Sequence, residues 1–116
     1  VLVYDAEQDI KNIKINRQIF DQINLDTGGV IVTSKGNNCD FVSRFFTPQA
    51  SILEDPVTGS AHCSLIPFWA KKLHKKELTA LQLSKRRGAL NCLNKNDRVI
   101  ISGQARTYSI GSIWIE

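Results

Sequence analysis

SAHCSLIPFWAKKL, residues 60–73, is the segment most informative about the fold, because its apolar side chains recur with the period of an α-helix. Spacings of three and four residues place these side chains on one helical face; they are Leu65, Phe68, Trp69 and Leu73. Pro67 lies inside the run and predicts a kink or a distorted turn. The segment therefore predicts a helix that is buried in the protein.

Downstream of this helix, the chain is strand-like to its end. Four runs rich in apolar and β-branched residues are separated by short polar or glycine-containing turns; they cover residues 78–84, 89–93, 99–105 and 113–115. Closely spaced strands with short turns favour an antiparallel meander. A central helix followed by this meander predicts an α+β fold, in which a mixed or antiparallel sheet wraps around the helix.

The first part of the chain predicts a strand and then a short helix. Residues 1–4 are apolar without a break, which is typical of a buried strand. Asp5 and Gln8 have the spacing of a capping box, so a helix should follow to about Ile13.

Between residues 16 and 47 we predict a second helix and two strands. Asn16 is an N-cap candidate for a helix over residues 17–23, with Ile19, Phe20 and Ile23 on one face. Residues 30–33 are β-branched, and residues 40–47 alternate between two faces. The first face carries Phe41, Ser43 and Phe45, and the second carries Val42, Arg44 and Phe46.

The composition is that of one ordinary globular domain over residues 1–116. Of these residues 42% are apolar and 22% are charged, which excludes collagen-like, low-complexity and disordered proteins. No apolar run reaches the roughly 20 residues that a membrane span needs, so we expect no membrane partner. The chain has no methionine and opens on an apolar strand, so we expect a fragment of a longer protein.

The three cysteines predict a reduced, cytoplasmic protein. Cys39, Cys63 and Cys92 are odd in number and lack CxxC spacing, which argues against a disulfide framework. We expect Cys63 to be a small buried apolar side chain and not a reactive thiol. Trp69, Trp114 and the phenylalanines are expected in the core.

The net charge of +4 does not by itself predict a nucleic-acid partner. Four lysines lie near the end of the predicted helix, where cations complement the helix dipole and remain solvated; they are Lys71, Lys72, Lys75 and Lys76. A second basic group covers residues 85–87. Because no aromatic residues are interleaved with either group for base stacking, we expect no nucleic acid.

The segment DPVTGSA, residues 55–61, is the strongest candidate for a functional site. It leads into the helix, where unpaired backbone N–H groups and the dipole favour an anion. Gly59 would allow a ligand close to the backbone, and Thr58 or Ser60 could cap the helix or donate a hydroxyl hydrogen bond. A carboxylate bound there would bring its α-carbon near Asp55, the layout for proton transfer. The same residues also fit an ordinary turn and N-cap, and their spacing leaves both interpretations open.

Other chemistries find less support in the sequence. Residues around Ser60 lack the G-x-S-x-G nucleophile elbow, and no phosphate-loop pattern occurs. His62 and His74 are the two histidines, and no ligand spacing for zinc accompanies them, so we expect no metal. His62 could face the anion site and bind a substrate, or pack as a neutral ring; the sequence leaves both possibilities open.

Four stretches occur in the order found in one protein family. They are RFFTP at residues 44–48, EDPVTGSAHC at 54–63, QLSKR at 82–86 and RVIISGQA at 98–105. In these stretches the chain resembles the phenazine-biosynthesis-like (PhzF-type) isomerase and epimerase family, and EDPVTGSAHC is the most specific of them. The resemblance implies two similar α+β halves, each a sheet around a central helix as in diaminopimelate epimerase, with the active site in the cleft between them.

The resemblance covers the C-terminal half of such a protein. It implies that Asp55 and Ser60 are catalytic, and that Thr58, Gly59, Ser60 and His62 bind the substrate, with Gly59 and Ser60 holding its carboxylate. The family's acid/base glutamate belongs to the N-terminal half, and nothing in this chain matches its motif. The resemblance also implies that neither a metal nor an organic cofactor is needed.

We therefore expect a cofactor-independent isomerase or epimerase that shifts a proton on a small carboxylate-bearing metabolite. The expected partners are that substrate, the N-terminal half and, through exposed apolar surface, a second copy of the chain. Proton transfer needs groups on both sides of the reacting carbon, so residues 1–116 alone should be inactive. The alternative is a non-catalytic module of the same fold that binds small molecules or another protein.

Overall fold

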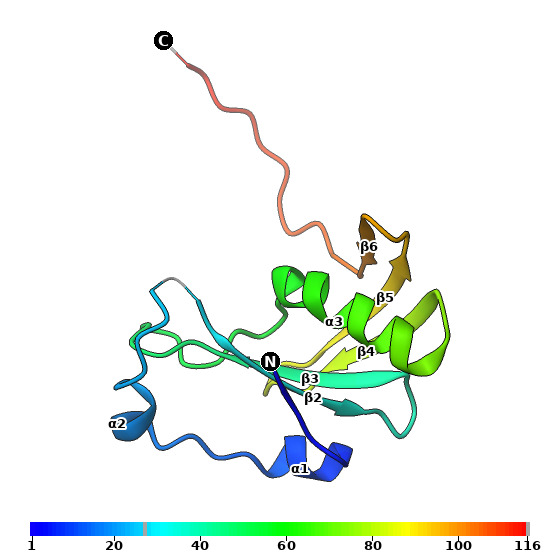
Figure 1. The fold of residues 1–116 in the computed structure, drawn as a ribbon. Coiled ribbons are helices and arrows are strands. Elements are labelled where there is room, and N and C mark those ends of the chain that lie inside the picture. Colours follow the sequence, from blue (N-terminus) through cyan, green and yellow to red (C-terminus); the bar gives the residue numbers. More distant parts are fainter. Residues whose placement is uncertain (27, 116) are drawn as a thin grey trace.

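The computed structural model describes residues 1–26 and 28–115, which form a mixed six-stranded sheet with helices on both of its faces (Figure 1). The strands lie side by side in chain order; they are β1 (Leu2–Val3), β2 (Val30–Lys35), β3 (Phe41–Phe46), β4 (Glu77–Gln82), β5 (Gly88–Asn94) and β6 (Val99–Ser102). The α+β class and the mixed sheet predicted from the sequence are confirmed.

The two parallel strand pairs decide where the helices lie. β1 pairs with β2 and β3 with β4 in parallel, whereas all other neighbours are antiparallel. Parallel neighbours need a crossover connection, which is usually helical. The first crossover contains α1 (Glu7–Asn12) and α2 (Arg17–Phe20), and the second contains α3 (Gly59–Leu73). The antiparallel meander of β4, β5 and β6 agrees with the prediction.

Two hydrophobic clusters cover the two faces of the sheet, and β3 contributes to both. Phe41 and Phe45 pack in the cluster on the α3 side, whereas Val42 and Phe46 pack in the cluster that contains Ile10 of α1. Successive strand residues point to opposite faces. The alternation predicted for residues 40–47 is therefore confirmed.

Helix α3 packs one side against the sheet. Its buried residues are Ala61, His62, Leu65, Ile66, Trp69 and Ala70. The Trp69 ring stacks on Phe41 with 5.9 Å between ring centroids, and its Nε1 donates to Thr33 Oγ1 at 3.0 Å. Phe68 is 40% exposed, so the helix is covered on one side and open on the other. A sheet that wraps fully around this helix stays a prediction.

The short helices differ from their predicted limits. Helix α1 begins at Glu7, with Ala6 just before it. The Ala6 backbone N–H donates to the Asp9 side chain at 3.1 Å, so Asp9 takes the capping position that was predicted for Gln8. Asn16 caps α2 as predicted, with its side chain accepting from the backbone N–H of Gln18 at 3.1 Å. Helix α2 ends at Phe20 instead of residue 23, and the backbone N–H groups of Gln22 and Ile23 donate to residues three positions earlier, as in a turn.

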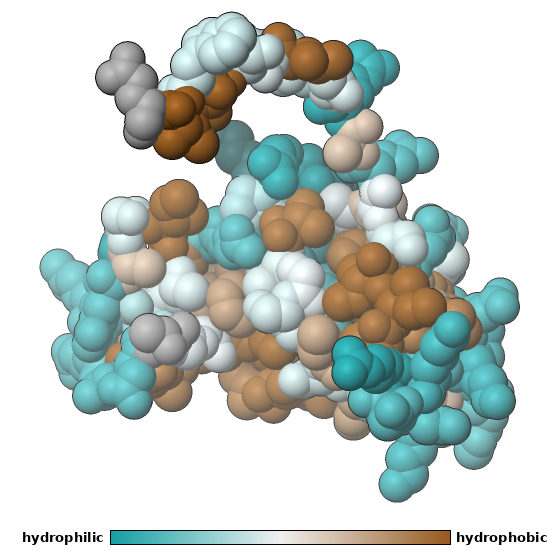
Figure 2. All heavy atoms as spheres, turned by 90° about the horizontal axis from the view of Figure 1, so that it is seen from above, coloured by the Kyte–Doolittle hydropathy of each residue, from teal (hydrophilic) through white to brown (hydrophobic). Residues whose placement is uncertain are grey.

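Both ends of the chain correct the sequence predictions. Residues 1–4 contain the strand β1, but their side chains are 37–64% exposed and not buried. Residues 103–115, called the tail below, contain no helix or strand, so the strand expected over residues 113–115 is wrong. Trp114 is 91% exposed and does not lie in the core. Figures 1 and 2 show the tail standing away from the sheet, with hydrophobic side chains along it.

The cysteines are free but differ in exposure. Cys63 is exposed, which corrects its predicted burial, and Cys39 is half-buried. Cys92 lies in the cluster on the α3 side, and burial raises the pKa of its thiol to about 11.

Among the described residues, no helix combines the length and apolar character that crossing a bilayer requires.

Candidate functional site

The loop that precedes α3 is anchored to the sheet at Asp55. The Asp55 backbone N–H donates to the carbonyl oxygen of Phe45 at 3.1 Å, and the Asp55 carbonyl oxygen accepts from Gln82 Nε2 at 2.7 Å. The loop is therefore held by the end of β3 on one side and the end of β4 on the other. This tether places the Asp55 carboxyl group beside the start of the helix.

Glu54 strengthens the same anchor. Its carboxylate pairs with Arg44, with Nε to Oε1 at 2.7 Å and Nη2 to Oε2 at 2.9 Å. Arg44 Nη1 also donates to the carbonyl oxygens of Ile10, within α1, and Ile13, just after it. Bidentate pairs of this kind are charge-assisted and geometrically specific. Glu54 is thus a paired residue that ties the loop to β3.

Gln82 organises the turn between Asp55 and α3. Its Oε1 accepts from the Thr58 backbone N–H at 2.7 Å, and its Nε2 donates to Thr58 Oγ1 at 3.0 Å. The Thr58 hydroxyl donates to Asp55 Oδ2 at 2.5 Å. Gln82 and Thr58 are 1% and 7% exposed, so water cannot easily replace these bonds. The Thr58 hydroxyl is used inside the loop and does not cap the helix.

The first turn of α3 offers open backbone donors next to Asp55. Gly59 and Ser60 are exposed, and the first N–H groups of a helix have no partner within it. A Cβ atom at Gly59 would meet nothing within 4 Å. A ligand can therefore approach these donors closely, and the dipole of the helix favours a negative charge there.

His62 faces inward from the same turn. It is fully buried against Phe41, and its Nδ1 lies 2.7 Å from the Thr58 carbonyl oxygen. Because a carbonyl oxygen only accepts, Nδ1 carries the proton. Nε2 has no hydrogen-bond partner among the described residues. Burial lowers the pKa of His62, so the ring is neutral at pH 7. Its predicted contact with a substrate stays a prediction.

The buried His62 predicts a pH dependence of stability. In the unfolded chain the ring takes up a proton near pH 6.5, and the folded protein resists this because its pKa is lower. The free energy of unfolding should therefore fall from pH 7 to pH 5, by at most about 1.4 kcal/mol per pH unit for one proton. Urea denaturation at several pH values measures this slope, and His62→Phe should flatten it.

His74 provides the matched control for this experiment. It is exposed and ends α3 in the left-handed conformation, with φ of 54°, which asparagine also adopts readily. His74→Asn should keep the slope between pH 7 and pH 5. A slope that survives in His62→Phe, or that disappears in His74→Asn, would contradict the assignment to His62.

All five predicted site residues lie within residues 55–62, but the structure gives them different surroundings. Gly59 and Ser60 are open to solvent, Asp55 is half-buried, and Thr58 and His62 are buried.

The sequence patterns predicted no role for Gln82. The available signal was a polar residue in the inward-facing series of β4, after Leu78 and Ala80.

Positive charge lies close to the anchored loop. The basic residues Lys85, Arg86 and Arg87 are exposed in the turn between β4 and β5. Arg86 lines two hollows beside the loop, one of about 540 Å³ with Pro56 and one of about 400 Å³ with Val57. These cations favour an anionic ligand at this end of the molecule.

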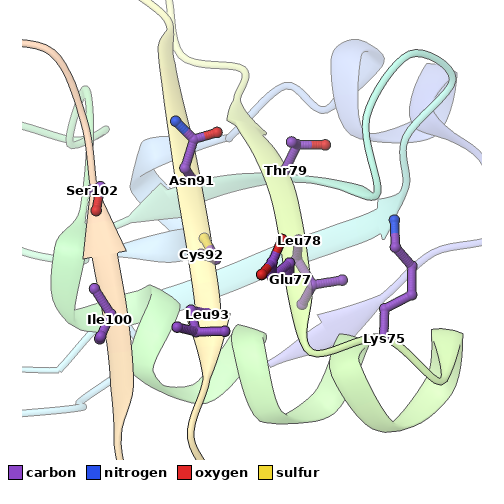
Figure 3. Close-up of a pocket in the computed structure, with 9 residues that line it drawn as sticks. All are labelled: Lys75, Glu77, Leu78, Thr79, Asn91, Cys92, Leu93, Ile100 and Ser102. Atoms are coloured by element: carbon purple, nitrogen blue, oxygen red, sulfur yellow. The ribbon is translucent and has the colours of Figure 1, made fainter.

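A further hollow, of about 590 Å³, lies away from the predicted site residues. Figure 3 shows its side chains, which come from β4, β5 and β6 and from Lys75 just before β4. None of the residues from 55 to 62 lines it. Within residues 1–26 and 28–115, no group of three or more His, Cys, Asp or Glu side chains is arranged to hold a metal ion.

Comparison with known proteins gives consistent results. The phenazine biosynthesis-like protein family (PhzC-PhzF) matches residues 1–111. An uncharacterized isomerase of Halalkalibacterium halodurans is 50% identical over 105 residues, which cover 89% of this chain and 39% of that protein. A phenazine biosynthesis-like domain-containing protein of Homo sapiens is 40% identical over 114 residues, which cover 90% of this chain and 39% of that protein.

A solved structure shares the fold. The crystal structure of a PhzF-family phenazine biosynthesis protein from Enterococcus faecalis matches with a TM-score of 0.85 at 42% identity, covering 97% of this chain and 43% of that one. The chain thus spans about two fifths of the length of these relatives. The match over residues 1–111, the sequence identities and the shared fold lead to one conclusion: the chain belongs to the phenazine biosynthesis-like (PhzC-PhzF) protein family.

Proposed function

We propose that this chain is the C-terminal half of a two-part protein that catalyses a cofactor-independent isomerisation or epimerisation of a small carboxylate-bearing metabolite. The N–H groups of Gly59 and Ser60 would hold the substrate carboxylate, and Asp55 would exchange a proton with the adjacent carbon. The observation that carries the proposal is the tethered Asp55 carboxyl group beside the open first turn of α3.

Physical chemistry supports this division of roles. Backbone N–H groups and the helix dipole stabilise an anion at α3, and they also stabilise the negative charge that develops when a proton leaves the α-carbon. Asp55 lies just before this turn and is held against Thr58, the residue that precedes the helix, so it would act on the atom next to the carboxylate. The exposed Ser60 hydroxyl can assist in handling the proton.

The proposal requires a second half. Exchange of a proton at carbon needs an acid and a base placed on either side, with water excluded. Relatives more than twice as long as this chain, several of them named isomerases, are consistent with this. The missing half would contribute the acid/base glutamate, and each half would be a sheet around a central helix, as in diaminopimelate epimerase. Residues 1–116 alone are expected to be inactive.

The carboxylate site can be tested on the chain itself by NMR titration with sodium acetate. The backbone N–H signals of Gly59 and Ser60 should shift in a saturable manner, with an affinity in the millimolar range that corresponds to about 4 kcal/mol. A titration with sodium chloride at the same ionic strength is the control for the general effect of salt on the signals. If sodium chloride shifts the Gly59 and Ser60 signals as much as sodium acetate does, the proposal is contradicted.

Two glycine variants make this test specific. Gly59→Ala adds a methyl group where the structure has open space, so the fold should persist while acetate binding weakens several-fold. Gly111→Ala is matched to it, because a Cβ atom there also meets nothing within 4 Å, but it lies in the tail. It should bind acetate as the wild type does. A complete protein that binds carboxylates but exchanges no proton would instead be the non-catalytic binding module.

A further inference from the structure

The two carboxyl oxygens of Asp55 differ in their hydrogen bonds. Oδ2 accepts from the Thr58 hydroxyl at 2.5 Å, and the Thr58 hydroxyl oxygen accepts from Gln82 Nε2 at 3.0 Å. A hydroxyl group has one proton to donate, and an amide NH₂ group can only donate. The donor direction of these two hydrogen bonds is therefore fixed: Gln82 donates to Thr58, and Thr58 donates to Asp55.

Gln82 is itself held in one orientation. Its Oε1 faces the Thr58 backbone N–H at 2.7 Å, and its Nε2 faces the Asp55 carbonyl oxygen at 2.7 Å. The first partner can only donate and the second can only accept, so exchanging the oxygen and nitrogen of the amide would break both bonds. With 1% of Gln82 exposed, the lost bonds could not be replaced by water.

We propose that Gln82 and Thr58 are positioning residues that commit Oδ2 of Asp55 to a hydrogen bond and leave Oδ1 as the atom that exchanges a proton with the substrate. This inference rests on the proposed function. In the step, the substrate C–H bond breaks, its electron pair stays on the substrate beside the carboxylate, and the proton moves to Oδ1. A proton then returns to the substrate, at the same carbon or another, so no net charge is transferred.

The Thr58 hydroxyl sets the angle of the carboxyl group. Rotation about the Cβ–Cγ bond of an aspartate has broad minima, so the bond by itself does not fix the plane of the carboxylate. The hydrogen bond to Oδ2 supplies that restraint. Without it, Oδ1 would sample a range of positions, and a displacement of about 1 Å at a reacting group can cost about 100-fold in rate.

Thr58→Val and Thr58→Ser form a matched pair for the test. Valine keeps the shape of threonine and the backbone N–H that binds Gln82, but it lacks the hydroxyl; serine keeps the hydroxyl. In the complete protein, Thr58→Val should lower kcat for solvent-deuterium incorporation by about 10- to 100-fold with little change in KM. Thr58→Ser should retain most of the wild-type rate. A Thr58→Val rate equal to wild type would overturn the inference.

A second measurement on the 116-residue chain is independent of activity. Both Nε2 protons of Gln82 are hydrogen-bonded inside the protein, so NMR should show them exchanging with water much more slowly than those of the exposed Gln104. Thr58→Val should speed this exchange, whereas Thr58→Ser should not. Equal exchange at Gln82 and Gln104 would overturn the inference whatever the activity. Failure of the proposed function is distinguishable, because the wild-type complete protein would then incorporate no deuterium, or Asp55→Asn would keep the wild-type rate, while the exchange of the Gln82 protons would still report on the hydrogen bonds.

Discussion

Replacing Asp55 with asparagine is expected to slow proton exchange by the complete protein by about 10²- to 10⁴-fold, the usual contribution of a positioned acid or base. Asparagine has nearly the same shape and can still accept the hydrogen bond from the Thr58 hydroxyl. Its amide cannot take up and return a proton. The rate is measured as deuterium incorporated from solvent into a small carboxylic acid that the wild type turns over, followed by mass spectrometry.

Asp97→Asn is the control for the loss of one negative charge. Asp97 is exposed in the turn between β5 and β6. Its replacement should leave the rate of deuterium incorporation near that of the wild type. Circular dichroism should show both variants folded, because neither change removes a buried apolar group. An Asp55→Asn rate within a factor of about ten of the wild type would contradict the role of Asp55, since that is below the range for such groups.

Replacing Trp69 with alanine is expected to have the largest effect on stability, about 3–5 kcal/mol in the free energy of unfolding. Trp69 is 1% exposed and stacks on Phe41, and its Nε1–H bond to Thr33 ties α3 to the sheet. Alanine would leave a cavity and remove one of the two hydrogen bonds of the buried Thr33 hydroxyl, which would keep its bond to the Val42 carbonyl oxygen. Urea denaturation followed by circular dichroism measures the loss, since tryptophan fluorescence changes with the substitution itself.

Trp114→Ala is the matched control, because it removes the same side chain from a position that is 91% exposed. It should change the free energy of unfolding by less than about 0.5 kcal/mol, as surface substitutions usually do. Trp69→Phe keeps a stacked ring but not the hydrogen bond to Thr33. If the alanine variant does not fold, the free energy of unfolding is measured on Trp69→Phe instead. Equal effects at the two tryptophans would contradict this description of the core.

Local patterns predicted the elements that lie in the middle of the chain. The spacing of apolar residues in 60–73 predicted a helix, and the structure has α3 from Gly59 to Leu73. The alternation in residues 40–47 predicted both the strand β3 and its two faces. These predictions succeed because most of the apolar face of each element meets a partner; Phe68, which the helical pattern places on the same face as Leu65 and Trp69, is 40% exposed.

The predictions that failed depend on a partner that is not next to the segment in sequence. Residues 113–115 are β-branched and aromatic, but in the described part of the chain no strand pairs with them. Strand propensity reflects packing against neighbours, so it does not form a strand alone. Likewise, Ile19 of α2 is 64% exposed although it continues an apolar pattern, because the core reaches only Phe20.

For the candidate site, local sequence was enough to predict which residues gather at the start of α3, because residues 55–62 are contiguous and a helix N-terminus always presents unpaired N–H groups. The contacts of each residue depend on the folded arrangement. Gln82 reaches the loop from 24 residues beyond Thr58, and it directs the Thr58 hydroxyl to Asp55. Hydrogen bonds between distant segments depend on the parallel pairing of β3 and β4 across the α3 crossover, and no local pattern encodes that pairing.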